Sequence, residues 1–348
     1  MKKIAIMGAG GFGTALSFIL SRAGHDIILW DIEKPLIKHW QKIGYSDRYP
    51  YLKNHKFPKN LKLSTEKKIS SSDFDFVIIS SSTSGIEGTL CCLNHDNKIP
   101  LVLIQKGMLP GLISPHDIAK NILPKATVMQ FTGAGFAKDL VNCSPAGMIV
   151  VHEPKDLAIA RSFAALFKGS NIWPTCCSDL FGVNIHNTLR TIASFEQGFV
   201  YGYFEKTLKS KPPVSTIAIT FSAISQETKL LARYLGATKE IHDIESKIYR
   251  IIEADLMLCQ SDSSRNFALG HFIGQGYNLA KSEQKVTEGV SECVTNISSI
   301  CKAVSKKIKK NEFKKRFPYL TAAKALISGK DINGEMIKIL KYHEKYLA

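Results

Sequence analysis

Glycines at fixed spacing near the start of the chain could bind a dinucleotide. The stretch GAGGFG places Gly8, Gly10 and Gly13 between an apolar run and a helical pattern. There the first glycine permits a tight turn, the second lets the backbone approach a pyrophosphate, and the third allows close helix–strand packing. Asp31 follows Gly13 by 18 residues, where a carboxylate would bind the adenine ribose hydroxyls and repel a 2′-phosphate. The pattern favours NAD over NADP, and a glycine-rich turn in an unrelated α/β protein is the alternative.

Polar residues also follow later apolar runs. Lys106 comes directly after the run 101–105, and polar turns begin at Ser80 and Gly133. Because ligands of parallel sheets bind beyond the carboxyl ends of the strands, we expect these residues at the ligand edge. A solvated lysine at a strand end is the alternative for Lys106.

A second polar group lies in the later, helical part of the chain. His186 and Arg190 are one helical turn apart, with Asn187 beside them, and would line an interdomain cleft if that flank faces the sheet edge. Ser264 suits an N-cap, which places Arg265 and Asn266 in a first turn whose N–H groups attract phosphate. Arg265 adds a bidentate cation. A surface arginine near a helix start is the alternative.

The elements that must position these residues alternate between strands and helices. Apolar runs at 3–7, 27–30, 74–80, 101–105, 127–131 and 148–151 predict strands, and residues 14–23 show helical spacing. This alternation predicts an α/β fold with a mostly parallel sheet. From residue 178 most segments have the helical period, so we place a domain boundary there.

The composition limits the cellular locations that we expect for this chain. The apolar start resembles a secretory signal, but four glycines interrupt it, so we expect it to be retained. No apolar stretch approaches the roughly 20 residues that span a bilayer, which predicts no stable membrane insertion. The eight cysteines lack metal-site spacing and fit free thiols in the cytoplasm, with no metal.

The net charge of +16 raises the possibility of nucleic-acid binding. The cations are 38 Lys and only 8 Arg, and the lysine-rich segment 302–316 holds few aromatic residues for base stacking. A solvated helix face, and no nucleic-acid partner, is the better interpretation. A basic cleft still suits anionic small molecules.

Six motifs in one order carry a family resemblance: GAGGFGTAL, QKG, FTGAGFAKDL, DLFGVNIHNTLRTIA, ADLMLCQ and SSRNFALG. From residue 1 to about residue 330 the chain resembles the NAD-dependent glycerol-3-phosphate dehydrogenases. The resemblance implies a Rossmann-like, doubly wound NAD-binding domain over 1–177 and an all-α substrate and dimerisation domain over 178–348. It also implies a homodimer that reversibly reduces dihydroxyacetone phosphate to sn-glycerol 3-phosphate with NAD, for phospholipid synthesis.

The resemblance and the patterns above together give a candidate site. The catalytic group is Lys106, Arg190 and Asp255. The residues expected to bind the cofactor are Gly8, Gly10, Gly11, Phe12, Gly13, Asp31, Lys106, Ala137, Arg265 and Glu288. The residues expected to bind the phosphorylated substrate are Lys106, Gly133, Arg265 and Asn266.

The chain departs from the family at the carbonyl-activating centre. Arg190 and Thr191 stand where the family has lysine and asparagine, and the threonine before Cys259 is missing. Guanidinium stays protonated above about pH 12, so Arg190 supplies charge and no proton, and Lys106 or a water held by Asp255 would donate it. Three functions stay open: this dehydrogenase with a shifted proton path, an NAD-binding homologue without catalysis, and a dehydrogenase of another small hydroxy substrate.

Overall fold

The computed structural model describes residues 1–66, 68–94, 99–258, 260, 264–286 and 291–347. The chain it describes divides into two compact units. Unit 1 comprises residues 1–109, 113–180 and 245–251, and unit 2 comprises residues 110–112, 181–244 and 252–348. No helix in the described ranges has the length and apolar character needed to cross a membrane.

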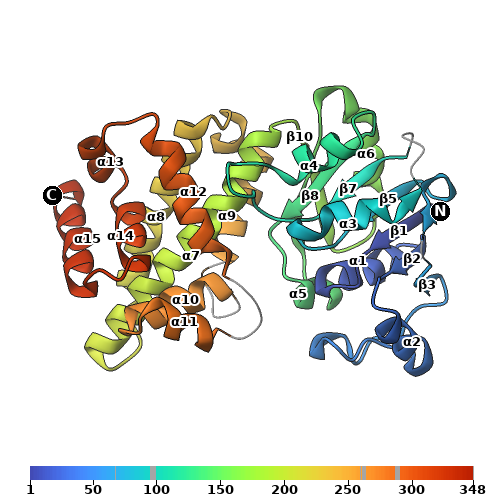
Figure 1. Ribbon diagram of the computed structural model, residues 1–348, viewed down its shortest axis with the longest axis horizontal. Helices are drawn as coiled ribbons and strands as arrows, with labels where there is room; N and C mark the ends of the chain where they lie inside the picture. Colours follow the sequence, from blue (N-terminus) through green and yellow to red (C-terminus); the bar gives the residue numbers. More distant parts are fainter. Residues whose placement is uncertain (67, 95–98, 259, 261–263, 287–290, 348) are drawn as a thin grey trace. The chain divides into compact units, whose positions relative to one another are not determined.

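Unit 1 is built on a sheet whose described strands number eight, in the order β10-β9-β8-β7-β5-β1-β2-β3 (Figure 1). Neighbours among these strands are parallel except β8 and β9, which confirms the mostly parallel sheet. The strands are β1 (Lys3–Met7), β2 (Asp26–Trp30), β3 (Leu61–Ser64), β5 (Phe76–Ile79), β7 (Leu101–Leu103), β8 (Val128–Gly133), β9 (Ala146–Val151) and β10 (Ile172–Cys177). A separate small sheet pairs β4 (Ile69–Ser70) with β6 (Leu93–Asn94).

Helices cover both faces of this sheet (Figure 1). Successive strand residues point to opposite faces, so Ile4 and Ile6 of β1 join one core while Ala5 and Met7 join another. The first core includes residues of α1 (Gly11–Arg22), α2 (Lys34–Ile43), α5 (Ala137–Val141) and α6 (Leu157–Ala164). The second includes residues of α3 (Ile86–Cys91) and α4 (Pro115–Ile122). Packing on both faces is the doubly wound arrangement.

The two edge strands were not predicted from the sequence. β10 contains Pro174, which usually argues against a strand, yet an edge strand tolerates proline because one of its sides forms no ladder. β3 has only four residues. β7 ends at Leu103, two residues before the predicted end, and the Gln105 amide beyond it donates to the carbonyls of Ile79 and Ser81.

Unit 2 is helical and is organised around α7 (Leu180–Leu208), whose residues are almost all buried from Gly182 to Val200. A helix buried on every side belongs at the centre of a domain. The other helices are α8 (Val214–Leu235), α9 (Lys247–Leu258, in unit 1 as far as Ile251), α10 (Arg265–Gly274), α11 (Leu279–Lys285), α12 (Glu292–Ser305), α13 (Lys310–Arg316), α14 (Pro318–Ile327) and α15 (Ile332–Leu347).

Glycines bring α7 and α10 into backbone contact. A Cβ atom on Gly198 or Gly202 of α7 would collide with the carbonyl oxygens of α10, and one on Gly274 of α10 would collide with α7. A Cβ on Gly270 would meet the Phe195 carbonyl oxygen and lie 2.8 Å from the Phe199 nitrogen. The two Gly-x-x-x-Gly pairs therefore fix the distance between these helices, in the way that small residues allow close helix approach.

Candidate active site

The glycine turn lies where the order of the sheet reverses. From β1 the chain continues to β2 and β3 on one side, then crosses to β5 on the other, so β1 and β5 flank a topological switch point. Gly8 follows β1 with a φ of +116°, and a Cβ there would lie 2.8 Å from the Ser80 carbonyl carbon after β5. Only glycine fits this position, and ligands of open α/β sheets bind at such a point.

The residues of the turn fit a dinucleotide pyrophosphate. α1 begins at Gly11 directly after Gly10, which caps it without a side-chain hydrogen bond, and the described first turn holds no acidic residue. A Cβ on Gly13 would lie 2.5 Å from the Gly8 carbonyl oxygen, so the helix sits tightly on the turn. Phe12 packs against the first core. The N-terminus of α1 can therefore hold an anion with backbone N–H groups.

Asp31 lies beside this turn, at the carboxyl end of β2. Its Oδ2 accepts the Ala9 N–H at 2.6 Å, and its Oδ1 accepts the Glu33 N–H at 2.9 Å. The carboxylate thus ties the glycine turn to the segment after β2.

A basic residue that no sequence motif predicts lies near Asp31. Arg48 donates to both carboxylate oxygens of Glu33, at 3.0 and 2.6 Å, and this bonding lowers the pKa of Glu33. The hydrogen bonds to Glu33 raise the pKa of the Arg48 guanidinium, and the charge of Asp31 adds to this effect. No motif marks Arg48, because it lies 15 residues from Glu33 in an irregular segment.

Lys106 and Gly133 meet at the carboxyl ends of neighbouring strands, as the sequence predicts. The half-buried Lys106 donates from Nζ to the Gly133 carbonyl oxygen at 3.4 Å. Gly133 ends β8 with a φ of +148°, and a Cβ there would lie 2.6 Å from the Gly147 oxygen. Ala137 follows at the first position of α5.

In unit 2, Arg190 and Asp255 form a buried ion pair between α7 and α9. Arg190 Nη1 donates to Asp255 Oδ1 at 2.9 Å, and the two residues are 7% and 1% exposed. Asp255 Oδ2 is also buried and has no hydrogen-bond partner within the described residues. The pair places a fixed positive charge and a carboxylate oxygen in a dry environment, where electrostatic interactions are strong.

The start of α10 has the predicted cap. Ser264 is the N-cap, and its side chain accepts the Phe267 N–H, which leaves Arg265 and Asn266 in the first turn. Arg265 is exposed. Asn266 Oδ1 accepts the Cys293 N–H at 3.1 Å, so the first turn of α10 is fastened to the start of α12.

Polar side chains on α7 contact α10 and α12 through hydrogen bonds that the sequence did not predict. Ser194 Oγ lies 2.8 Å from Ser264 Oγ, and Thr191 Oγ1 accepts from Asn296 Nδ2 of α12 at 2.9 Å. Together with Arg190, α7 thus contacts α9, α10 and α12 within five residues. Polar residues at helical spacing inside an apolar helix were the available sequence signal.

His186 is buried one turn before Arg190, with 4% of its surface exposed. Burial lowers the pKa of its imidazole to about 4, the charge of Arg190 also lowers it, and Asp255 opposes the shift. The imidazole is therefore neutral at pH 7.

Two predictions fall outside the described residues: Glu288, and the altered segment around Cys259. Among the described residues, no group of three or more His, Cys, Asp or Glu side chains could hold a metal ion.

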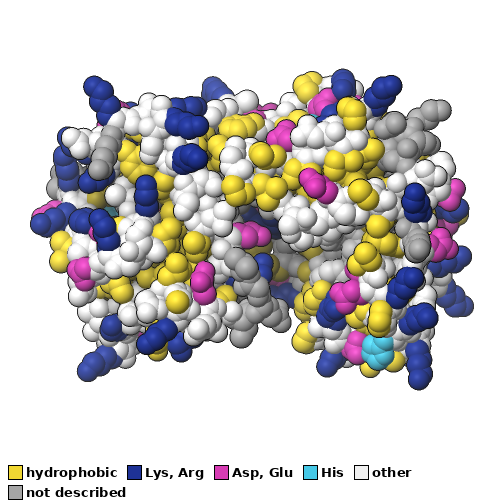
Figure 2. Space-filling model, in the orientation of Figure 1, with side chains coloured by type: hydrophobic (Ala, Val, Ile, Leu, Met, Phe, Trp, Pro, Cys, Tyr) yellow, Lys and Arg dark blue, Asp and Glu magenta, His cyan; other side chains and the backbone are white. Residues whose placement is uncertain are grey.

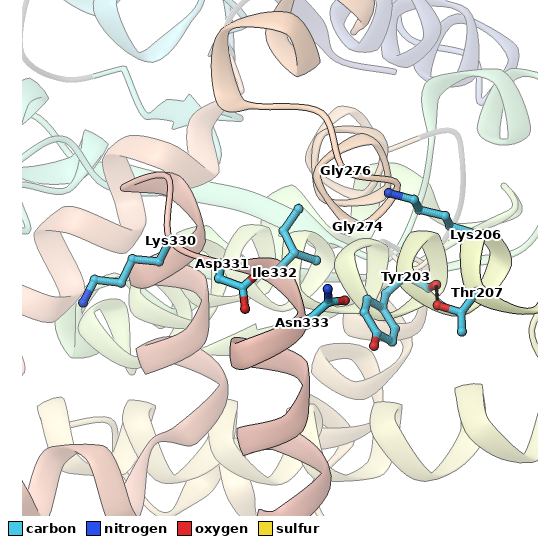
Figure 3. Close-up of a pocket in the computed structure, with 9 residues that line it drawn as sticks. All are labelled: Tyr203, Lys206, Thr207, Gly274, Gly276, Lys330, Asp331, Ile332 and Asn333. Carbon is cyan, nitrogen blue, oxygen red and sulfur yellow. Dashed lines mark hydrogen bonds between the residues drawn. The ribbon is translucent and has the colours of Figure 1, made fainter.

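A cavity of about 460 Å³ lies elsewhere in unit 2 and contains none of the predicted site residues (Figure 3). It is lined by Tyr203, Lys206, Thr207, Gly274, Gly276, Lys330, Asp331, Ile332 and Asn333. The Asp331 carboxylate accepts the Gly334 N–H at 2.7 Å and so already occupies the N-terminus of α15. Because its lining charges belong to exposed side chains, we do not place the active site there.

Comparisons with known proteins identify a family for this chain. The model of the NAD-dependent glycerol-3-phosphate dehydrogenase N-terminus matches residues 3–158, and that of the bacterial NAD-dependent C-terminal domain matches residues 254–312. The glycerol-3-phosphate dehydrogenase (NAD(P)+) of Francisella philomiragia is 28% identical over 309 residues, which cover 85% of this chain and 86% of the relative.

Solved structures show the same fold. The glycerol-3-phosphate dehydrogenase of Coxiella burnetii has a TM-score of 0.77 at 20% identity and covers 97% of this chain and 98% of its own. That of Plasmodium falciparum has a TM-score of 0.79 at 17% identity, with coverage of 97% and 95%. The chain therefore belongs to the NAD-dependent glycerol-3-phosphate dehydrogenase family and is an NAD-dependent oxidoreductase that acts on a CH–OH group.

Proposed function

We propose that this protein reversibly reduces dihydroxyacetone phosphate to sn-glycerol 3-phosphate with NAD(H), and so supplies phospholipid synthesis. The observation that carries the proposal is the start of α10. Ser264 caps a first turn that contains Arg265 and Asn266, and Ser194 joins this cap to α7 one turn after the Arg190–Asp255 pair. A hydrogen bond thereby joins the proposed phosphate-binding turn to α7, which carries the arginine proposed to bind the substrate oxygen.

Unit 1 would hold the cofactor, and unit 2 would hold most of the substrate residues. Gly8, Gly10, Gly11 and Gly13 would surround the pyrophosphate at the N-terminus of α1, with Phe12 and Ala137 nearby. Bound NADH supplies the hydride for the ketone carbon. Lys106 and Gly133 lie in the same unit, where Lys106 adds a cation for anionic groups. We assign NAD binding to residues 1–177 and the substrate and dimer functions to residues 178–348.

In unit 2 the polar and charged groups have different proposed roles. Arg265 and Asn266 would bind the phosphate, because a guanidinium forms bidentate bonds and an amide nitrogen donates. Arg190 would stabilise the negative charge that develops on the substrate oxygen. Asp255 would hold the guanidinium in position through the 2.9 Å hydrogen bond.

NAD is the proposed cofactor in preference to NADP. The Asp31 carboxylate beside the glycine turn would accept ribose hydroxyls and repel a 2′-phosphate. Arg48 lies close enough for the two charges to interact, and an arginine there would attract a 2′-phosphate. Because Glu33 already binds that guanidinium, we expect the preference to be moderate. A homodimer and a cytoplasmic location stay predictions.

The specificity of turnover tests the proposal. Dihydroxyacetone phosphate should give a kcat/KM at least about 100-fold above that of unphosphorylated dihydroxyacetone, because phosphate contacts contribute several charge-assisted hydrogen bonds. Equal values for the two ketones would contradict a phosphate site at Arg265.

One observation supports a second candidate. Arg190 stands where the family resemblance expects a lysine, and an arginine cannot donate the proton. A homologue that binds NAD without catalysis would have these features. NADH binding without turnover of any small ketone would support it.

A further inference from the structure

The imidazole of His186 has no assigned role, although the charges of Asp255 and Arg190 act on it. Its Nε2 atom is buried and has no hydrogen-bond partner within the described part of the chain. Buried polar atoms in proteins are usually hydrogen-bonded, so an unpartnered nitrogen among reactive groups suggests a ligand.

The position of His186 brings it near the oxygen that Arg190 would bind. Residues four apart on a helix are neighbours, with Cβ atoms roughly 5–6 Å apart. His186 and Arg190 have this spacing on α7, and both are buried. The charges that act on the imidazole come from Arg190 on α7, Asp255 and Glu253 on α9, and His242. A substrate oxygen bound to the guanidinium is therefore within reach of the imidazole.

Reduction of the ketone needs a proton donor, and Arg190 cannot serve as one. Reduction adds a proton to the substrate oxygen, and oxidation removes it. Guanidinium keeps its proton at every working pH. Imidazole gives up and accepts protons readily, which makes histidine the commonest general acid and base in enzymes.

We propose that His186 exchanges the proton with the substrate oxygen. This inference rests on the proposed function. In reduction, the hydride from the bound cofactor forms the new C–H bond, and the π electrons of the carbonyl move to oxygen. That oxygen takes the proton from Nε2 of the imidazolium, which becomes neutral imidazole. In oxidation, neutral imidazole takes the hydroxyl proton as the hydride returns to NAD+.

The charge state of the imidazole gives this mechanism a distinct pH dependence. Because burial lowers the pKa of His186 to about 4, the donor form becomes scarcer as the pH rises above that value. The kcat/KM for reduction should therefore fall about tenfold per pH unit from about pH 7 to 9, a range in which the substrate phosphate (pKa about 6) is already ionised. A donor that stays protonated through this range would give a flat profile instead.

The kinetic test compares His186→Gln with the wild type in both directions. Glutamine preserves a hydrogen-bonding group but transfers no proton, so kcat should fall about 10²- to 10⁴-fold, as expected for general acid–base catalysis. The steep pH dependence of reduction should be lost, and the KM for dihydroxyacetone phosphate should stay within about twofold. His116→Gln is the matched control, since His116 is a buried histidine of unit 1.

A binding readout accompanies the kinetics. In NMR spectra of the wild type, the imidazole signal that is absent from His186→Gln should shift when sn-glycerol 3-phosphate is added without cofactor. If His186→Gln does not fold, His186→Asn is used to assign the imidazole signal. The pH profile of the wild type then tests the inference together with that signal. Wild-type turnover with a flat profile, or an unshifted signal, would overturn the inference alone. No wild-type turnover would overturn the proposed function and the inference with it.

Discussion

Arg190 and Asp255 show how the surroundings of a residue limit its chemistry. The guanidinium is held at 2.9 Å from a carboxylate that is 1% exposed, so removing either partner would leave the other charged in the interior. Breaking a buried pair in that way usually costs about 3–5 kcal/mol. The ion pair therefore holds Arg190 as a fixed positive charge in the interior of unit 2.

At the residue scale, a change at Asp31 tests the proposed preference for NAD. Asp31→Ala should weaken NADH binding about tenfold, because it removes charge-assisted hydrogen bonds to the ribose worth about 1.5–3 kcal/mol. NADPH binding should weaken less, because the repulsion of its 2′-phosphate is removed as well. Fluorescence titration measures both affinities. Asp26→Ala, at the other end of β2, is the control. Equal losses for the two cofactors would show that Asp31 does not contact the ribose.

Also at the residue scale, a change at Arg265 tests the proposed phosphate site. Arg265→Lys should raise the KM for dihydroxyacetone phosphate about tenfold, because lysine cannot form the bidentate contact. NADH affinity should change little. Arg233→Lys changes an exposed arginine in the last turn of α8 and should have no effect. An unchanged KM in Arg265→Lys would place the phosphate elsewhere.

At the scale of elements, the α7–α10 contact sets the position of the first turn of α10. Gly270→Ala places a Cβ against the Phe195 carbonyl oxygen and pushes α10 away from α7. Overpacking of this kind costs about 1–3 kcal/mol, and the displaced Arg265 should raise the substrate KM. Thermal unfolding and steady-state kinetics measure the two effects.

Gly88 in α3 offers the matched control for that change. A Cβ on Gly88 has nothing within 4 Å, so Gly88→Ala should be neutral or slightly stabilising. If Gly270→Ala behaves like Gly88→Ala, the two helices do not depend on close backbone approach.

The elements also show how far the sequence alone could predict this protein. The strand–turn–helix around Gly8 and the Ser264 cap were predictable, because both depend on residues that are neighbours in the chain. The link between Ser194 and Ser264 and that between Thr191 and Asn296 were not, because their partners are 70 and 105 residues apart. β10 was missed because Pro174 argues against a strand unless its edge position is known.

At the scale of the whole molecule, the net charge of +16 comes from 46 Lys and Arg side chains against 30 Asp and Glu. Figure 2 shows Lys and Arg side chains spread over the drawn face, with Asp and Glu side chains between them. The lysine-rich segment 302–316 keeps most of its described lysines exposed, as a solvated face would. On the drawn face, the Lys and Arg side chains do not gather into a single patch.

Two buried carboxyl groups make the stability of the molecule depend on pH. Burial raises the pKa of Glu227 to about 8, and burial together with the nearby Glu227 raises the pKa of Glu196 well above its ordinary value. The folded state therefore binds more protons than the unfolded state above about pH 4.5. This contribution to stability is complete below that pH and is lost as the pH rises through 8.

Glu196→Gln should reduce that loss, since an amide replaces a carboxyl group that must otherwise ionise in the interior. The difference in melting temperature between pH 6 and pH 9 should be smaller in this variant than in the wild type. Glu312→Gln, an exposed change on α13, should leave the difference as it is. Identical pH dependence in all three proteins would contradict the buried carboxyl pair.

The proposed function requires that NADH be oxidised when dihydroxyacetone phosphate is added to the enzyme. We predict saturable loss of NADH absorbance that requires both the ketone and the enzyme, with sn-glycerol 3-phosphate as the product. Tight NADH binding by fluorescence, with no loss of absorbance at high enzyme and ketone concentrations, would contradict the proposed dehydrogenase.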